Sequence, residues 1–323
     1  MSSAVTSMRC LTLPTHFHPS SRSSSRLGGV RCEFRVSEIA AVAREEFYAA
    51  PVLDIEDVAR GIRCVTVEAQ ISRELVHRED AYTRPGQLAR VRVKGNVYRV
   101  PVCSPPFSKE TNWSVLYKMR GDMPSGAVKA PNSTLSVKAP LQLHVVSEEE
   151  EEACLLASVG QVIELGPFEG ASGIDLRPVL FISGFPTLLM FASGTGIAVA
   201  RAIIEANEGD AGSLSLSFRH QVRLYYSAPD PTLIAYKSRF GEWEKRKVKT
   251  RSTVCSRRGG EDWDGFVGSF SELWEEDDIE YDPHTTAVVV CAEEQSAIAE
   301  IKDLLSRAEI PDKQVIYWNA AAL

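Results

Sequence analysis

The chain has 323 residues, of which 44% are hydrophobic and 24% charged, and its formal net charge is −7. These values exclude disorder of the whole chain, and at roughly 100–200 residues per domain they predict two domains. Residues 33–323 carry 32 basic and 43 acidic side chains, a net charge of −11. A chain this acidic is a poor nucleic-acid binder, because neutralising phosphates requires a cationic face.

Residues 1–32 differ in composition from the rest of the chain. They contain eight serines, four arginines and no acidic residue, and they lack the long apolar stretch of a secretory signal. This composition is typical of an organellar transit peptide and is most similar to plastid presequences, so we expect a protein of the plastid stroma. The alternative is a disordered tail that carries no targeting information.

Seven cysteines are scattered along the chain, without a C-x-x-C pair, so the sequence predicts neither a disulfide framework nor a metal or iron–sulfur site. Residues 178–200 carry no charge and are long enough to cross a bilayer. They include Pro178, Pro186, Gly194 and Gly196, however, and a helix through these residues is improbable. A buried strand, a glycine turn and a helix start fit better, so we expect no transmembrane segment.

From residue 52 to 183 the pattern is one of short strands. Several alternate apolar and polar residues, and clusters of Pro, Gly and Ser separate them. The predicted strands cover residues 62–67, 88–93, 96–102, 135–137, 141–146 and 162–165. Half-buried antiparallel strands of this kind predict a small β-barrel or sandwich.

From residue 184 to 323 strands alternate with helices. The predicted strands cover residues 187–192, 220–226, 286–291 and 315–318, and the predicted helices cover residues 197–205, 231–246 and 295–308. This alternation predicts a doubly wound α/β domain with a parallel sheet and right-handed crossovers. The expected architecture is therefore an antiparallel β-barrel followed by an α/β nucleotide-binding domain.

The strongest motif is Ser193-Gly194-Thr195-Gly196-Ile197, between the first strand of the α/β half and its first helix. Glycines there let backbone N–H groups approach a pyrophosphate, and the helix N-terminus adds a favourable dipole. A lone G-T-G also fits a plain strand–helix turn. Its position favours the nucleotide, because ligands of open α/β sheets bind outside the carboxyl ends of the strands.

Together with this motif, four later segments of the sequence resemble the corresponding segments of the ferredoxin–NADP reductase family, and within it those of plant plastid reductase-like proteins. In order, they are residues 224–228, 256–257, 288–291 and 315–319. The resemblance covers about residues 60–320 and is thinner in the first half. It implies a flavin-type barrel, residues 52–183, that binds FAD, and an NAD(P)-binding domain, residues 184–323.

The resemblance also assigns the nicotinamide nucleotide to particular residues. Its pyrophosphate is expected on Gly194, Thr195 and Gly196, and the 2′-phosphate of NADP(H) on Ser256 and Arg257. A guanidinium suits a dianionic phosphate, whereas sites specific for NAD usually carry a carboxylate there. The basic cluster of residues 245–258 has two interpretations, a phosphate-binding role or a solvated helix end and loop.

The flavin motif R-x-Y-[ST] of the family is absent at the corresponding stretch, residues 97–106, where Tyr98, Arg99 and Ser104 are the candidate FAD contacts. Glutamates 148–152 stand where the family has a Gly/Ser/Thr-rich helix start, and five carboxylates there should repel a diphosphate. The terminal Cys-Gly of the family, beside the nicotinamide, becomes Cys291-Ala292. Cys291 is thus the candidate catalytic residue, with a buried small hydrophobe as the alternative.

Two functions remain open. The first is a plastid NAD(P)H:acceptor oxidoreductase, a flavoprotein in which hydride passes between NADP(H) and FAD and electrons continue to an unidentified acceptor. Ferredoxin is disfavoured as that acceptor, because docking it requires a basic face. The second is a degenerate reductase fold that has lost its flavin and acts as a non-catalytic binding or regulatory protein. A flavin-free NADP(H) binder lies between the two.

Overall fold

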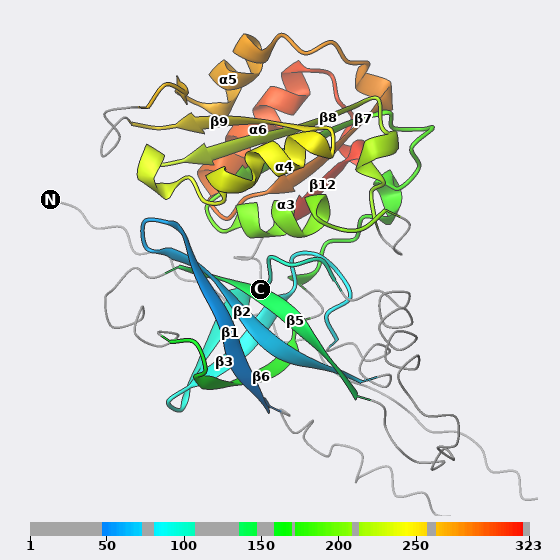
Figure 1. Ribbon diagram of the computed structural model, residues 1–323. Coiled ribbons are helices and arrows are strands. Elements are labelled where there is room, and N and C mark those ends of the chain that lie inside the picture. The colour runs from blue at the N-terminus through cyan, green and yellow to red at the C-terminus, as the bar shows by residue number, and fades with distance from the viewer. Residues whose placement is uncertain are drawn as a thin grey trace, which may run out of the picture. The chain divides into compact units, whose positions relative to one another are not determined.

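The structure is a computed structural model, and it describes residues 47–72, 81–106, 136–146, 158–169, 172–208, 213–256 and 263–318. All of these belong to one compact unit, Glu45–Leu323. They form two six-stranded sheets, one antiparallel and one parallel (Figure 1). Within the described residues, no helix is both long enough and apolar enough to span a membrane.

The antiparallel sheet has the strand order β4-β3-β6-β1-β2-β5 and is barrel-like but not closed. Its strands are β1 (Tyr48–Ala59), β2 (Ile62–Ser72), β3 (Leu88–Val93), β4 (Asn96–Pro101), β5 (Ser136–Val146) and β6 (Val162–Phe168). A bridge between Val102 and Leu143 joins the end of β4 to β5. Alternate side chains, among them Val65, Val67 and Leu141, are buried in the core of this sheet.

Two strands differ from those predicted. β1 carries Asp54, Glu56 and Asp57, so it lacks the apolar alternation that would have revealed it. β5 is one strand rather than two, and it runs through Pro140, which pairs with Glu68 of β2. The missing N–H of a proline is tolerated because β5 is an edge strand, paired by a full ladder on one side alone.

The parallel sheet has the order β10-β9-β8-β7-β11-β12. Its strands are β7 (Thr187–Ser193), β8 (Gln221–Ala228), β9 (Val248–Val254), β10 (Phe266–Val267), β11 (Thr286–Cys291) and β12 (Val315–Trp318). The α-helices are α3 (Gly196–Ile204), α4 (Phe240–Lys245), α5 (Phe270–Asp277) and α6 (Gln295–Arg307). Short 3₁₀ turns cover residues 177–179, 216–218, 231–233, 237–239, 283–285 and 312–314. The predicted fold class is confirmed.

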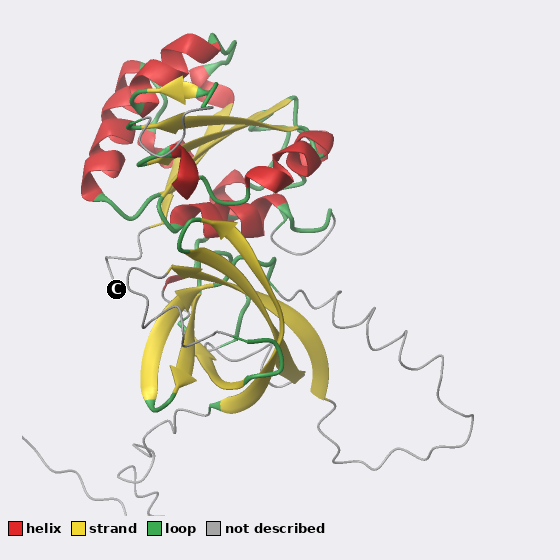
Figure 2. Ribbon diagram, turned by 60° about the vertical axis from the view of Figure 1, so that its left-hand side comes forward, coloured by secondary structure: helices red, strands yellow, loops and turns green. Residues whose placement is uncertain are grey.

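Helices cover both faces of the parallel sheet (Figure 2). Side chains of α3 and α4 share one apolar cluster with one face of the strands, including Leu188 and Met190 of β7. Side chains of α5 and α6 share another cluster with Leu189 and Phe191 of the same strand. Because both faces are covered, every residue of β7 and β11 is buried, which explains their continuous apolar sequence.

The single helix predicted over residues 231–246 is wrong. The chain instead forms two 3₁₀ turns and then α4, with a break at Tyr236, whose backbone is left-handed at φ 60°. The Ala235 N–H donates to the Tyr226 hydroxyl at 3.1 Å rather than to a helical carbonyl. This hydrogen bond to Tyr226 takes the place of a backbone hydrogen bond that a continuous helix would require.

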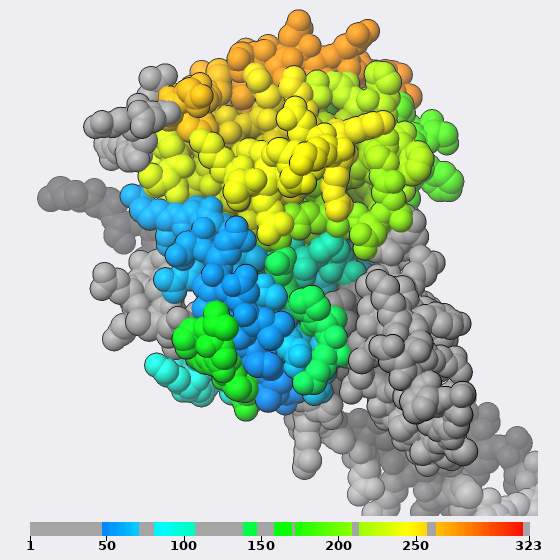
Figure 3. Space-filling view, viewed as in Figure 1, coloured from blue at the N-terminus to red at the C-terminus, as the bar shows by residue number. Residues whose placement is uncertain are grey.

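The hairpin between β1 and β2 contacts the α/β half of the chain. The Arg60 N–H donates to the Thr232 carbonyl at 2.9 Å, and the Arg60 guanidinium pairs with Asp230 at 3.1 Å. Arg239 also pairs with Glu56 at 3.5 Å. In Figure 3 the blue surface of this hairpin lies against the yellow-green and yellow segments that carry these partners.

Gly86, in the turn before β3, packs directly on Trp318 at the end of β12. The Trp318 Nε1–H donates to the Gly86 carbonyl at 2.9 Å. A Cβ on Gly86 would lie 2.6 Å from Trp318 Cδ1, and the backbone there has φ +84°. Only glycine satisfies both constraints, so the first sheet's Pro-Gly-Gln turn is fixed to the last strand of the second.

We therefore expect Gly86→Ala to lower the free energy of unfolding by about 2–4 kcal/mol. About 1–2 kcal/mol comes from the left-handed backbone and the rest from overpacking against the indole. The control is Gly95→Ala, because Gly95 has φ +90° but a Cβ there would meet nothing within 4 Å. Chemical denaturation of both variants measures the difference, and equal losses would contradict the packing argument.

Candidate nucleotide site and a buried polar network

The glycine turn lies where the parallel sheet changes direction. From β7 the chain proceeds to β8 and β9 on one side, and β11 and β12 lie on the other. The carboxyl ends of β7 and β11 therefore flank the crevice in which sheets of this kind bind ligands. Gly194 has φ +55°, and a Cβ on Gly196 would lie 1.9 Å from the Cys291 carbonyl oxygen. Both glycines are thus required by the backbone.

Within the part of the chain that the structure describes, two hydroxyls in this turn have no hydrogen-bond partner. They are the buried Oγ of Ser193 and the buried Oγ1 of Thr195. Leaving a buried hydroxyl unpaired costs about 1–3 kcal/mol, so such groups in a native structure call for an explanation. A ligand that accepts hydrogen bonds at this turn would satisfy them.

A carboxylate already approaches the turn. Oε2 of Glu293, two residues after β11, lies 3.4 Å from the Thr195 backbone nitrogen, which is at the start of α3. Backbone N–H groups at a helix N-terminus favour anions, and the Glu293 contact illustrates this preference. The turn therefore offers the Thr195 N–H, which already meets a carboxylate, and two hydroxyls that lack a partner among the described residues, and this donor set fits a pyrophosphate.

Cys291 ends β11 beside this turn and is fully buried. Burial raises the pKa of its thiol well above the usual range, so the thiol stays protonated. Its backbone carbonyl, rather than its sulfur, is the atom that contacts the turn through Gly196. The structure thus places Cys291 next to Gly194, Thr195 and Gly196, with the properties of a small apolar side chain.

Ser256 follows β9, and its N–H donates to the Pro229 carbonyl at 3.1 Å, while Arg257 and Arg258 lie outside the described residues. The bases upstream of them have protein partners. Lys245 pairs with Glu242, Arg246 donates to the Ile204 carbonyl, Lys247 donates to the Ser217 carbonyl, and Lys249 and Arg251 pair with Asp277. The basic side chains of residues 245–251 are thus engaged by other parts of the fold, which disfavours a phosphate-binding role for this part of the basic cluster.

The candidate flavin contacts lie apart from this turn in sequence and have partners of their own. Arg99 forms a two-pronged ion pair with Glu169, with Nε and Nη2 at 3.0 and 2.5 Å from Oε2. Tyr98 is half-buried and packs against the core of the antiparallel sheet. Ser104 is buried, and its Oγ accepts from the Gln142 N–H at 3.1 Å.

The ion pair of Arg99 with Glu169 affects how this chain could bind the pyrophosphate of FAD. A guanidinium that already holds a carboxylate with both prongs lacks the arrangement that would bind a flavin pyrophosphate. The predicted second flavin element, with glutamates 148–152, lies outside the described residues. Among the described residues, therefore, the donor set at the glycine turn fits a nicotinamide nucleotide, whereas Arg99 would have to release Glu169 before it could bind a flavin diphosphate.

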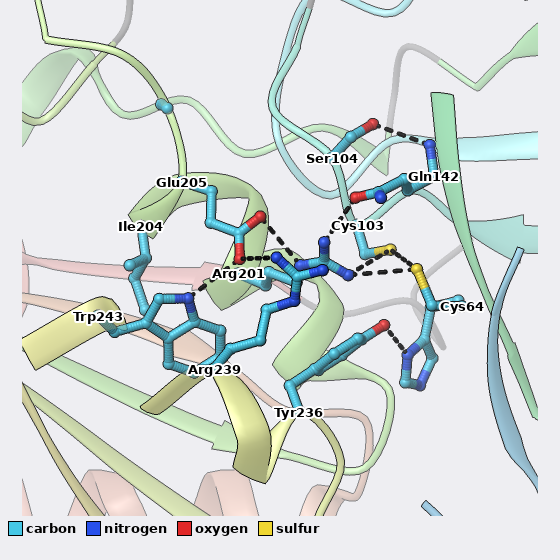
Figure 4. A network of polar contacts seen from close by, with 12 residues as sticks. Cys64, Cys103, Ser104, Gln142, Arg201, Ile204, Glu205, Tyr236, Arg239 and Trp243 are labelled. Carbon is cyan, nitrogen blue, oxygen red and sulfur yellow. Dashed lines mark hydrogen bonds and ion pairs between the residues drawn. The ribbon is translucent and has the colours of Figure 1, made fainter. Parts of the chain in front are cut away.

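A buried polar network that was not predicted from the sequence surrounds Arg201 (Figure 4). Arg201 lies in α3 and is fully buried. Its guanidinium donates to Gln142 Oε1 of β5 at 2.5 Å and pairs with Glu205 at 3.1 Å. It also donates to two sulfurs, Cys64 of β2 at 3.3 Å and Cys103 at 3.5 Å. The network links α3 to the antiparallel sheet.

Tyr236 and His144 extend this network. The Tyr236 ring lies under the Arg201 guanidinium, 4.6 Å from its centroid, and the Tyr236 hydroxyl is 2.7 Å from His144 Nδ1. His144 pairs across the sheet with Cys64 and is buried. The members come from residues 64 to 236, so no local motif marks them. The one sequence signal was an arginine among the apolar residues of a predicted helix.

The comparisons with known proteins agree with this geometry. Residues 190–298 match the family model described as "Oxidoreductase NAD-binding domain". Among solved structures, the CS-b5R domains of human Ncb5or in the NAD+ form have a TM-score of 0.56 and 13% identity, covering 85% of this chain and 70% of that one. A ferredoxin NADP+ reductase from Neisseria gonorrhoeae with bound FAD and NADP has a TM-score of 0.52 and 15% identity, covering 84% and 98%. At these identities the structures establish the fold.

A curated relative comes from kiwifruit. The fruit protein pKIWI502 of Actinidia deliciosa is 25% identical over 233 residues, which is 70% of this chain and 62% of that protein. The chain thus spans less than two thirds of that relative's length. The predicted resemblance to ferredoxin–NADP reductase-like proteins is confirmed, and residues 190–298 support the binding of a nicotinamide nucleotide.

We expect Ser193→Ala to weaken NADPH binding about fivefold without loss of stability. The hydroxyl has no partner among the described residues, so removing it costs none of their hydrogen bonds, while about 1 kcal/mol of a contact to the ligand is lost. Fluorescence titration and thermal melts measure the two quantities. A lower melting temperature with unchanged affinity would assign the hydroxyl to the fold instead.

His144 should make the protein sensitive to acid. Burial, with a smaller contribution from the charge of Arg201, lowers the pKa of His144 from 6.5 to about 3. Below pH 6.5 the imidazole of His144 therefore binds a proton in the unfolded chain but not in the folded protein. The free energy of unfolding consequently falls as the pH falls. At about 1.36 kcal/mol per pH unit, the loss between pH 7 and pH 5 is about 2 kcal/mol.

Denaturation at the two pH values measures this loss. His144→Asn, whose amide can still meet the Tyr236 hydroxyl, should lose about 2 kcal/mol less than the wild type between pH 7 and pH 5. His220→Asn is the matched control, because His220 is exposed, and it should follow the wild type. Parallel curves for all three proteins would contradict a buried neutral His144.

Proposed function

We propose that this protein is an NAD(P)H:acceptor oxidoreductase of the ferredoxin reductase type. The observation that carries the proposal is the turn Ser193–Gly196. It lies at the switch point of the parallel sheet, presents the Thr195 N–H to an anion and has two buried hydroxyls with no partner among the described residues. The match of residues 190–298 to an NAD-binding domain supports the same role.

In this proposal the turn holds the pyrophosphate, and Glu293 moves away when the nucleotide binds. The carboxylate is a single flexible side chain 3.4 Å from the Thr195 nitrogen, so its displacement needs no backbone change. Ser256, after β9, and Arg257 beside it are proposed to meet the 2′-phosphate and to favour NADPH over NADH. The nicotinamide would then face the end of β11 and Cys291.

A flavin, if bound, would supply the chemistry that passes electrons from the nicotinamide nucleotide to a further acceptor, while the residues of this chain would bind and orient the nucleotide. FAD is proposed here from the resemblance to reductases, one of which was solved with FAD and NADP bound. The residues of this chain that would hold it are not Arg99 and Tyr98 in the arrangement described above. The acceptor is proposed to be a separate molecule.

A non-catalytic binding or regulatory protein is the second candidate function. The specific observation in its favour is the Arg99–Glu169 ion pair, which engages the candidate flavin-binding arginine in a stretch where the family's flavin motif is absent. The packing of Trp318 on Gly86 points the same way, since it commits an aromatic ring of the last strand to the fold. In this alternative the nucleotide site remains and flavin is absent.

We further propose a plastid location, with residues 1–32 as the transit peptide. The support is their composition, rich in Ser and Arg and free of acid, against the acidic remainder of the chain. Expression of the full chain with a fluorescent protein at its C-terminus tests the location. Fluorescence outside plastids would overturn it.

The visible absorption spectrum of the purified full chain distinguishes the two functions. We expect bands of oxidised flavin that NADPH bleaches under anaerobic conditions, and that NADH bleaches at higher concentration only. A colourless protein that FAD fails to reconstitute, but that still binds NADPH, would establish the second candidate. A protein that binds neither nucleotide would overturn both proposals for the glycine turn.

A further inference from the structure

Two cysteines far apart in sequence lie side by side in the buried network. The Sγ atoms of Cys64, in β2, and Cys103, two residues after β4, are 3.9 Å apart (Figure 4). Both side chains are buried, and the proposed nucleotide chemistry uses neither of them. Two thiols this close need to approach by roughly 2 Å to reach the disulfide bond length of about 2.05 Å.

The surroundings of the pair favour a thiolate. The hydrogen bond from the Cys103 thiol, together with the charge of Arg201, lowers the pKa of Cys64 to about 7, whereas burial raises that of Cys103. The charged and titratable groups that face the pair are Arg201 of α3, Glu56 of β1, Tyr82, His144 of β5 and Tyr236. At neutral pH, therefore, Cys64 is the nucleophile and Cys103 retains its proton.

We propose that Cys64 and Cys103 are an oxidation site, at which hydrogen peroxide produces an intramolecular disulfide that a dithiol reverses. The Cys64 thiolate attacks peroxide, its sulfur is oxidised to a sulfenic acid, and hydroxide leaves. The Cys103 sulfur then displaces the hydroxyl group of that sulfenic acid, and water is released as the S–S bond forms. A dithiol reductant returns two electrons and two protons by thiol–disulfide exchange and becomes a disulfide itself.

The other described cysteines lack this combination. Cys291 is buried and its thiol pKa is raised, with no cationic group among the causes. Cys255 is exposed and directly follows the end of β9. Peroxide is little larger than water and can reach a buried site through local opening of the structure. The proximity of a second thiol and the guanidinium therefore distinguishes the Cys64–Cys103 pair from both.

Oxidation changes the contacts of Arg201. In the reduced protein its Nη1 donates to both sulfurs, and the thiolate balances its charge. A disulfide is neutral and a poor acceptor, so a buried guanidinium loses part of its compensation, which is costly in a protein interior. Arg201 lies in α3, whose first residue, Gly196, belongs to the glycine turn. We therefore expect oxidation to weaken NADPH binding, a consequence that rests on the proposed function.

The test treats the reduced full chain with hydrogen peroxide at pH 6 and pH 8 and maps its peptides by mass spectrometry. We expect a peptide that joins Cys64 to Cys103, forming about tenfold faster at pH 8, and lost on treatment with dithiothreitol. Cys64→Ser and Cys103→Ser should abolish it, and their hydroxyls still offer Arg201 an acceptor. Cys255→Ser is the matched control and should leave it unchanged.

A full chain in which peroxide oxidises the exposed Cys255 but leaves Cys64 and Cys103 as free thiols would overturn the proposal. Nucleotide binding is measured separately on the reduced and oxidised forms. A rise of about fivefold or more in the dissociation constant for NADPH supports the link through α3, and an unchanged constant refutes that link. If the reduced protein binds no NADPH, the proposed function fails while the disulfide result stands.

Discussion

Arg201 is a guanidinium that keeps its charge in a fully buried position, and both halves of the chain supply its partners. Glu205 comes from its own helix, Gln142 from β5 and the two sulfurs from β2 and the segment after β4. A buried charge is tolerated only where such partners compensate it, and loss of one partner typically costs 3–5 kcal/mol. The position of α3, and with it the glycine turn at its start, therefore depends on contacts made by the antiparallel sheet.

The two halves of the chain differ in how well they fit the proposed reductase function. The nucleotide half has the sheet, the switch point and an anion-directed turn, all in the arrangement that dinucleotide-binding proteins share. In the antiparallel half, the candidate flavin contact Arg99 is paired with Glu169, and the Gly86 turn is covered by Trp318 of β12. The parallel-sheet half is suited to bind a nicotinamide nucleotide, from which the proposed electron transfer starts. Catalysis then depends on whether the antiparallel half binds flavin.

The sequence predicts those features whose pattern lies within one short segment of the chain. Buried parallel strands such as β7 and β11 are continuous apolar runs, and the G-T-G turn is local, so both were found. β9 was missed because its alternation was interpreted as a basic cluster, and α5 because its capping box, Ser269 with Glu272, was overlooked. The Arg201 network joins Cys64, Cys103, Gln142 and Tyr236, and its members become neighbours only through pairing of strands distant in sequence. Single-sequence patterns carry no information about such pairing.

Asp277, the last residue of α5, meets three cations from two adjacent strands: Arg223 at 3.1 Å, Lys249 at 3.6 Å and Arg251 at 3.3 Å. Arg223 and Lys249 are directly opposite each other in the β8–β9 ladder, where like charges repel. The single carboxylate makes that pairing acceptable, and its side chain is only 2% exposed. Salt screens surface ion pairs but reaches buried ones poorly. The contact between α5 and the sheet should therefore persist at salt concentrations that screen the exposed ion pairs of this acidic protein.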